Sequence, residues 1–196
     1  MKKIFFLFTI CITAFAVQGQ EFNTHLTTAR TSYKAGKLDE SRFAMEQLLQ
    51  EIDIMVGKEV LKILPPKIED KAANTASDNV SGASGYFGVV IHREYGTPEK
   101  NISVEIISNS PLITSLNAML ALPMIGGAGG DSKVVRIAGY KALLNKVAGE
   151  GDKSNYEIQL PMSTALITLR APDYTQEQVL KIANSLPIAQ IAKMIQ

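Results

Sequence analysis

Apolar residues near the start of the chain follow helical spacing in two successive segments. They recur three or four positions apart from Phe22 to Tyr33, and Gly36 then breaks the pattern. A second predicted helix carries one apolar stripe, formed by Met45, Leu48, Leu49, Ile52, Val56, Val60 and Ile63. The two prolines at 65–66 end it, because proline cannot continue a helix. Residues 20–64 are therefore predicted to form a helical hairpin.

The next stretch, residues 65–84, has no periodic apolar pattern after Ile68. Lys, Asp, Asn, Ser, Ala and Gly dominate it. It has too few apolar residues to offset the entropy lost on ordering it. We therefore predict a flexible linker over residues 65–84.

From Gly85 onward the pattern changes to short alternating runs that are typical of β-strands. The predicted strands cover residues 86–95, 101–108, 133–137, 139–147, 156–160 and 164–169. An apolar helix over residues 111–122 separates the second strand from the third, with Ser110 as its N-cap and Pro111 at its first position.

A final helix is predicted from about Thr175, which has capping-box spacing to Gln178. Pro187 interrupts this helix, and an apolar stripe continues beyond it. The order β-β-α-β-β-β-β-α predicts an α+β domain over residues 85–196, with an antiparallel sheet and helices packed on one side.

Two stretches resemble known families. Residues 33–48, with Tyr33, Gly36 and Leu38 at their start, are similar to the turn and second helix of a tetratricopeptide repeat. They cover about one repeat, whereas a repeat array needs about three, so a hairpin packed on itself or on the rest of the protein is favoured. Residues 85–196 resemble the PsbP-like family of small exported α+β proteins in strand–helix order and in the closing segment 174–186. This resemblance implies a fold, and a fold does not determine a function.

The first nineteen residues have the three parts of a secretory signal peptide. Lys2 and Lys3 precede an uncharged apolar stretch over residues 4–17. Cleavage is predicted after Gly19, with Ala16 as the alternative. The mature chain is then expected in the periplasm or outside the cell.

The cysteine content and charge of the chain exclude several classes of function. The single cysteine, Cys11, lies in the apolar part of the signal and lacks a lipobox, so the mature chain is predicted to have neither a disulfide nor a cysteine nucleophile. Loss of Lys2 and Lys3 lowers the formal net charge by two, from +1 to −1. A nucleic-acid surface needs a concentrated basic patch, which the sequence lacks.

Two motifs that suggest a bound cofactor or metal are better explained as structure. The glycine run at 126–130 follows a helix and precedes a strand, which is the wrong context for a phosphate-binding loop. His25 and His92 have no second histidine or cysteine at ligand spacing. We expect no cofactor and no metal site.

The candidate catalytic groups are also better explained as structure. Ser84 follows Gly82 at the spacing of a nucleophile elbow, but Tyr86 stands where the motif needs its final glycine, and the segment lies in the predicted linker. Glu150 and Asp152 lie in a polar turn, where carboxylates are fully solvated and their pKa values are not driven apart. We predict that the protein is not an enzyme.

The predicted helix over residues 111–122 and its continuation are more apolar than a helix with one buried face requires. One interpretation buries this helix against the sheet. The other makes it an exposed apolar wall, in which methionines adapt to a greasy ligand or a partner. The candidate binding surface consists of Leu112, Leu116, Met119, Leu120 and Met124.

Two functions stay open at this point. The first is a non-catalytic exported protein of the cell envelope that binds another protein through the hairpin, the apolar helix or both. The second is a carrier of a small hydrophobic ligand or lipid held between sheet and helix.

Overall fold

The computed structural model describes residues 20–82, 88–98, 100–121, 131–148 and 154–195. The chain divides into two compact units, Met1–Ile52 and Asp53–Gln196. Helix α2 (Leu38–Ile63) is continuous through this division. The predicted signal peptide and Met124 lie outside the described residues, as do Ser84, the glycine run at 126–130, Glu150 and Asp152.

The described part of the first unit is the predicted helical hairpin. Residues 20–34 are helical, and α2 follows after a short turn at Gly36. Gly36 has a φ of 72°, a conformation that glycine adopts without steric cost. The two helices contact each other through small residues, and the Ser41 hydroxyl donates a hydrogen bond of 2.8 Å to the carbonyl oxygen of Ala29.

The predicted linker over residues 65–84 is wrong for most of its length. Residues Lys67–Ile68 form strand β1 and residues Lys71–Gly82 form β2, which pairs antiparallel with β3 (Val89–Thr97). No apolar alternation marks this strand in the sequence, because β2 is a polar strand near the edge of the sheet. Backbone pairing with β3, rather than burial of apolar side chains, supplies most of its contacts.

The predicted strands and helices after residue 85 are confirmed with small changes at their ends. The structure has β4 (Lys100–Ser108), α3 (Leu112–Ala121), β5 (Ser132–Ile137), β6 (Tyr140–Ala148), β7 (Ser154–Pro161), β8 (Ala165–Ala171), α4 (Gln176–Ser185) and α5 (Ile188–Ile195). The capping box is present at α4, where the Thr175 hydroxyl accepts from the Gln178 N–H and the Gln178 side chain accepts from the Thr175 N–H.

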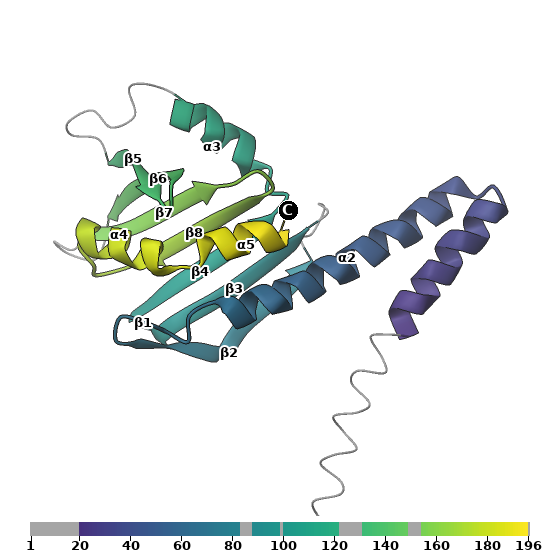
Figure 1. Cartoon of the computed structure of the whole chain (residues 1–196), viewed down its shortest axis with the longest axis horizontal. Helices are drawn as coiled ribbons and strands as arrows, with labels where there is room; N and C mark the ends of the chain where they lie inside the picture. The colour runs from purple at the N-terminus through teal and green to yellow at the C-terminus, as the bar shows by residue number, and fades with distance from the viewer. Residues whose placement is uncertain (1–19, 83–87, 99, 122–130, 149–153, 196) are drawn as a thin grey trace, which may run out of the picture. The chain divides into compact units, whose positions relative to one another are not determined.

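The eight strands of the described residues form one antiparallel sheet in the order β1-β2-β3-β4-β8-β7-β6-β5 (Figure 1). Strands β1 to β4 are neighbours in chain order, and so are β5 to β8. The two halves meet where β4 pairs with β8, and α3 lies in the connection between them. The α+β class with an antiparallel sheet is therefore confirmed.

The main core lies on one face of this sheet. Helices α4 and α5 cross that face, and the last turns of α2 also pack on it (Figure 1). Val60, Ile182 and Ile191 anchor these three helices in the core, and each is at most 1 % exposed. Helix α3 instead packs against Leu143 and Leu166, which alternate with core residues along β6 and β8 and so point to the opposite face. The prediction that the helices pack on one side therefore fails for α3.

A buried ion pair joins the end of α2 to the sheet. The Arg93 guanidinium on β3 donates two hydrogen bonds to the Asp78 carboxylate on β2, at 2.6 and 2.8 Å. It also donates to the carbonyl oxygen of Leu61 in the last turn of α2, at 2.8 Å. Hydrogen bonding to Asp78 raises the pKa of Arg93. A cation at a helix C-terminus is favourable because the last carbonyl groups there lack partners.

Candidate functional site

The candidate binding surface predicted on α3 is divided by the structure. Leu116 and Leu120 are each only 6 % exposed and pack on Leu143 and Leu166. Leu112 and Met119 are 52 % and 39 % exposed. Two of the four described residues therefore hold α3 on the sheet, and the other two do not form a continuous apolar wall with them.

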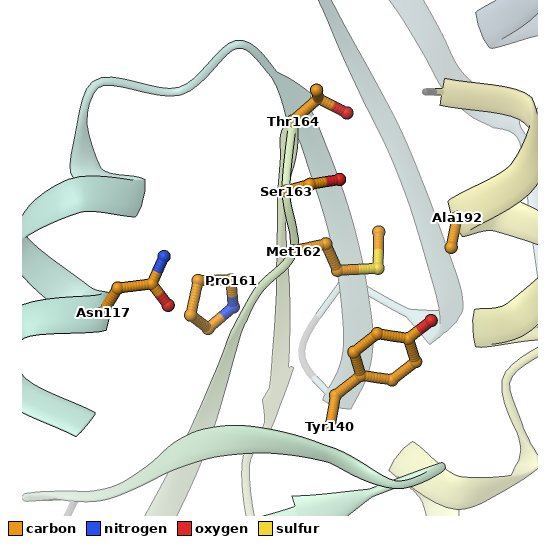
Figure 2. Close-up of a pocket in the computed structure, with 7 residues that line it drawn as sticks. All are labelled: Asn117, Tyr140, Pro161, Met162, Ser163, Thr164 and Ala192. Carbon is orange, nitrogen blue, oxygen red and sulfur yellow. The ribbon is translucent and has the colours of Figure 1, made fainter. Parts of the chain in front are cut away.

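A cavity of about 260 Å³ lies beside α3. It is lined by Asn117, Tyr140, Pro161, Met162, Ser163, Thr164 and Ala192. In Figure 2 the side chains of Tyr140 and Met162 lie next to each other, facing Ala192 on α5. The Thr164 hydroxyl donates to the carbonyl oxygen of Ile195. The volume is just below the usual range for ligand pockets, about 300–1,000 Å³, and no charged group lines the cavity.

The sheet face opposite the main core carries polar side chains that contact one another. Arg170 and Gln159 both donate to the Glu157 carboxylate, at 2.7 and 2.6 Å. His92 and Glu94 approach to 3.5 Å on β3. Among the described residues no three His, Cys, Asp or Glu side chains are grouped to hold a metal ion.

The largest set of exposed apolar side chains is on the helical hairpin. Seven of them belong to residues 26–52, and each is at least 44 % exposed: Leu26, Tyr33, Leu38, Phe43, Met45, Leu49 and Ile52. Soluble proteins rarely leave so many large apolar residues exposed together, and such patches mark interaction sites.

The buried seam between the two helices is built mainly from small residues. Ala29 and Ser32 of the first helix face Ser41, Ala44 and Leu48 of α2, and all five are at most 9 % exposed. Ser32 also donates to the Glu40 carboxylate at 3.2 Å. Small residues let the helices approach closely, but they bury little apolar area, so the hairpin leaves its large apolar residues outside the seam.

Six of the seven exposed apolar residues lie on one face of the hairpin. Tyr33, Met45 and Ile52 each follow a seam residue by four positions, which rotates them by about 40° in the same sense. In an antiparallel helix pair, residues rotated in the same sense from the seam fall on the same side. The other three exposed leucines lie next to these residues on the same side of their helices. We define the hairpin face as all six residues: Leu26, Tyr33, Leu38, Met45, Leu49 and Ile52.

Phe43 is the exception. It lies nine positions before Ile52, about two and a half helical turns, so it is on the opposite side of α2. It is nevertheless 61 % exposed, against 55 % for Leu49. Phe43 is therefore a matched control for experiments on the hairpin face.

Charged side chains border the hairpin face on both long edges. Arg30 and Lys34 follow Leu26 by four and eight positions and lie beyond it on the first helix. On α2 the corresponding edge carries Asp39, Arg42 and Glu46, and Arg42 pairs with Glu46 at 2.9 Å. One edge thus has a formal charge of +2 and the other of −1.

The helical spacing of the sequence predicts one common stripe for Met45, Leu48, Leu49 and Ile52. The structure separates Leu48, which is buried in the seam, from the other three. The exposed residues of α2 can be told from the buried ones by their spacing. Leu38, Met45, Leu49 and Ile52 follow one another after seven, four and three positions, which places them in a row along α2 beside the seam.

Comparisons with protein-family models, curated proteins and solved structures give no match to this chain. The resemblances to PsbP-like proteins and to a tetratricopeptide repeat therefore stay predictions. Within the described residues, no helix combines the length and apolarity needed to cross a membrane.

Proposed function

We propose that the chain is a non-catalytic protein-binding module of the cell envelope and that the hairpin face is its docking surface. The observation that carries this proposal is the exposure of six large apolar residues on one side of the hairpin. Their 7-4-3 spacing suits helix–helix packing, in which side chains interlock every three to four residues.

Export supports the envelope as the place of action. Lys2 and Lys3, the uncharged stretch over residues 4–17 and the small residue Gly19 form the pattern of a cleavable signal peptide. Processing after Gly19 leaves Gln20 as the first residue, directly at the first helix of the hairpin. The docking element would then be the N-terminal part of the exported protein.

Docking is a better explanation of the structure than carriage of a hydrophobic ligand. The cavity beside α3 is small, whereas the hairpin face is an open apolar surface with charged edges. An open surface with a polar rim is the usual anatomy of a protein interface.

Crosslinking in intact cells tests the docking proposal. The full coding sequence is expressed in three forms: the unchanged chain, the double variant Leu49→Asp/Ile52→Asp, and Phe43→Asp. The unchanged chain and Phe43→Asp should give the same discrete crosslinked adduct. The double variant should lose it, because two aspartates desolvated in an apolar interface cost several kcal/mol.

Purified protein from the same cells provides the folding control. Each form should start at Gln20 and have the same helix content by circular dichroism. If the double variant is folded and keeps the adduct, the hairpin face is not the docking surface.

A further inference from the structure

We infer that the occupant of the hairpin face is a second copy of the same chain, so that two hairpins form an antiparallel four-helix bundle. This inference rests on the proposed docking function of the hairpin face and names its partner. The hairpin face is complementary to itself in its apolar residues and in the charges along its edges.

A two-fold axis parallel to the helices would place the first helix of one protomer over α2 of its partner. The residue levels within the hairpin follow from its own contacts, in which Ser41 meets Ala29, Ser32 meets Glu40 and His25 lies 3.6 Å from Glu51. Two residues of the hairpin that lie at the same height along the helix axes therefore have residue numbers that add to about 70–76, and we call this height their level.

The same level rule applies across the two-fold axis, because rotation about that axis does not shift residues along it. Tyr33 of one protomer then meets Leu38 of the other, and Leu26 meets Met45 and Leu49. Large apolar side chains thus face large apolar side chains at both levels, which is the packing that a helical bundle requires.

The charged edges match under the same operation. The edge with Arg30 and Lys34, of formal charge +2, comes over the partner's edge with Asp39, Arg42 and Glu46, of formal charge −1. Arg30 is at the level of both Arg42 and Glu46, and Arg42 is already paired with Glu46 in its own protomer. Lys34 and Asp39 have numbers that add to 73, so they are at the same level and form two symmetric contacts per dimer. A two-fold axis across the helices would instead bring like edges together, and it is disfavoured for that reason.

The alternative partners fit this surface less well. A nucleic acid or an anionic membrane would favour a uniformly basic rim, whereas this rim is basic on one edge and acidic on the other. A second hairpin supplies both the apolar area and the opposite order of charges.

Analytical ultracentrifugation of the purified protein tests the inference. The protein is expressed from its full coding sequence, so that any processing takes place, and is studied over about a hundredfold range of concentration. A reversible monomer–dimer equilibrium is expected for the unchanged chain and for Phe43→Asp. Leu49→Asp should weaken the dimer by about a hundredfold or more, because it places a charge at the centre of the interface.

A charge exchange distinguishes this arrangement from any other dimer. Lys34→Glu or Asp39→Lys alone should weaken the dimer by about tenfold, since each turns two attractive contacts into repulsive ones. The double variant Lys34→Glu/Asp39→Lys should return to within about threefold of the unchanged chain. A double variant that is weaker than both single variants overturns the proposed axis.

The two proposals fail in different ways. A chain that is monomeric at every concentration, yet gives a crosslinked adduct of another mass that the Leu49→Asp/Ile52→Asp variant loses, overturns the second copy and keeps the docking function. A dimer that Leu49→Asp does not weaken overturns the second copy, because the contact then lies elsewhere. If the folded Leu49→Asp/Ile52→Asp variant also keeps its crosslinked adduct, the docking function fails as well.

Discussion

The helical hairpin and the sheet unit differ in what their apolar residues contact. In the sheet unit, α4, α5 and the end of α2 bury their large apolar side chains against the strands. In the hairpin, the seam is made mainly of small residues, and the large apolar side chains are exposed. The comparison shows that helical periodicity identifies the apolar side of a helix but does not reveal whether the same chain covers it.

The same contrast occurs within single helices. Helix α3 buries Leu116 on the sheet and exposes Leu112, although both residues are leucine. Helix α2, whose first half is exposed in the hairpin, is in close contact with the sheet at Gly57. A Cβ atom there would lie 2.7 Å from Cγ1 of Val80, so glycine permits the close contact of α2 with the sheet.

The largest expected effect concerns α3. Leu116→Asp should lower the free energy of unfolding by about 4 kcal/mol or more, because it places a charge in the small core formed with Leu143 and Leu166. Leu112→Asp, on the exposed side of the same helix, should change it by less than about 0.5 kcal/mol. Urea unfolding followed by circular dichroism measures both values.

Equal effects of the two substitutions would break the distinction between buried and exposed positions on α3. If neither variant loses stability, α3 is not held on the sheet. Its apolar residues would then again be candidates for a binding surface.

A smaller effect is expected at the ion pair that holds the end of α2. Arg93→Met should lower the free energy of unfolding by about 3 kcal/mol, because Asp78 is left unpaired while only 17 % of its side chain is exposed. Arg170→Met removes the pair with Glu157, in which Arg170 is half exposed, and leaves that carboxylate its hydrogen bond from Gln159, so it should cost less than about 1 kcal/mol.

A double variant sharpens this prediction with the same urea measurement. Replacing Asp78 by leucine in the Arg93→Met background should restore part of the stability, since no unpaired charge is then left. A double variant less stable than Arg93→Met would show that Asp78 has another role.

The sequence predicted the strands and helices after residue 85 because their alternating and helical patterns are locally complete. It missed β2 because the residues that order this strand are distant in the chain. Asp78 is polar and uninformative until Arg93 is placed beside it. The sequence also could not show which apolar residues of α3 are buried and which are exposed. That depends on Leu143 and Leu166, which lie on two other strands.

The candidate site was only partly predictable for a similar reason. The stripe from Met45 to Ile52 was visible in the sequence, and so was the end of the first helix at Gly36. Its separation into a seam and an exposed face depends on how the two helices are rotated about their axes. That rotation places Ser41 in contact with Ala29, a contact between helices that no local pattern predicts.

The central claim is that the hairpin face is not part of the chain's own core, and two neighbouring leucines test it most directly. Hydrogen exchange of the backbone amides in residues 20–52 is measured in Leu48→Asp and Leu49→Asp, in solution dilute enough that the unchanged chain is monomeric. We predict that Leu49→Asp keeps the protection of the unchanged chain and that Leu48→Asp loses it, because only Leu48 is buried in the seam. Loss of protection in both variants would contradict the account, since the exposed row would then be needed to fold the hairpin itself.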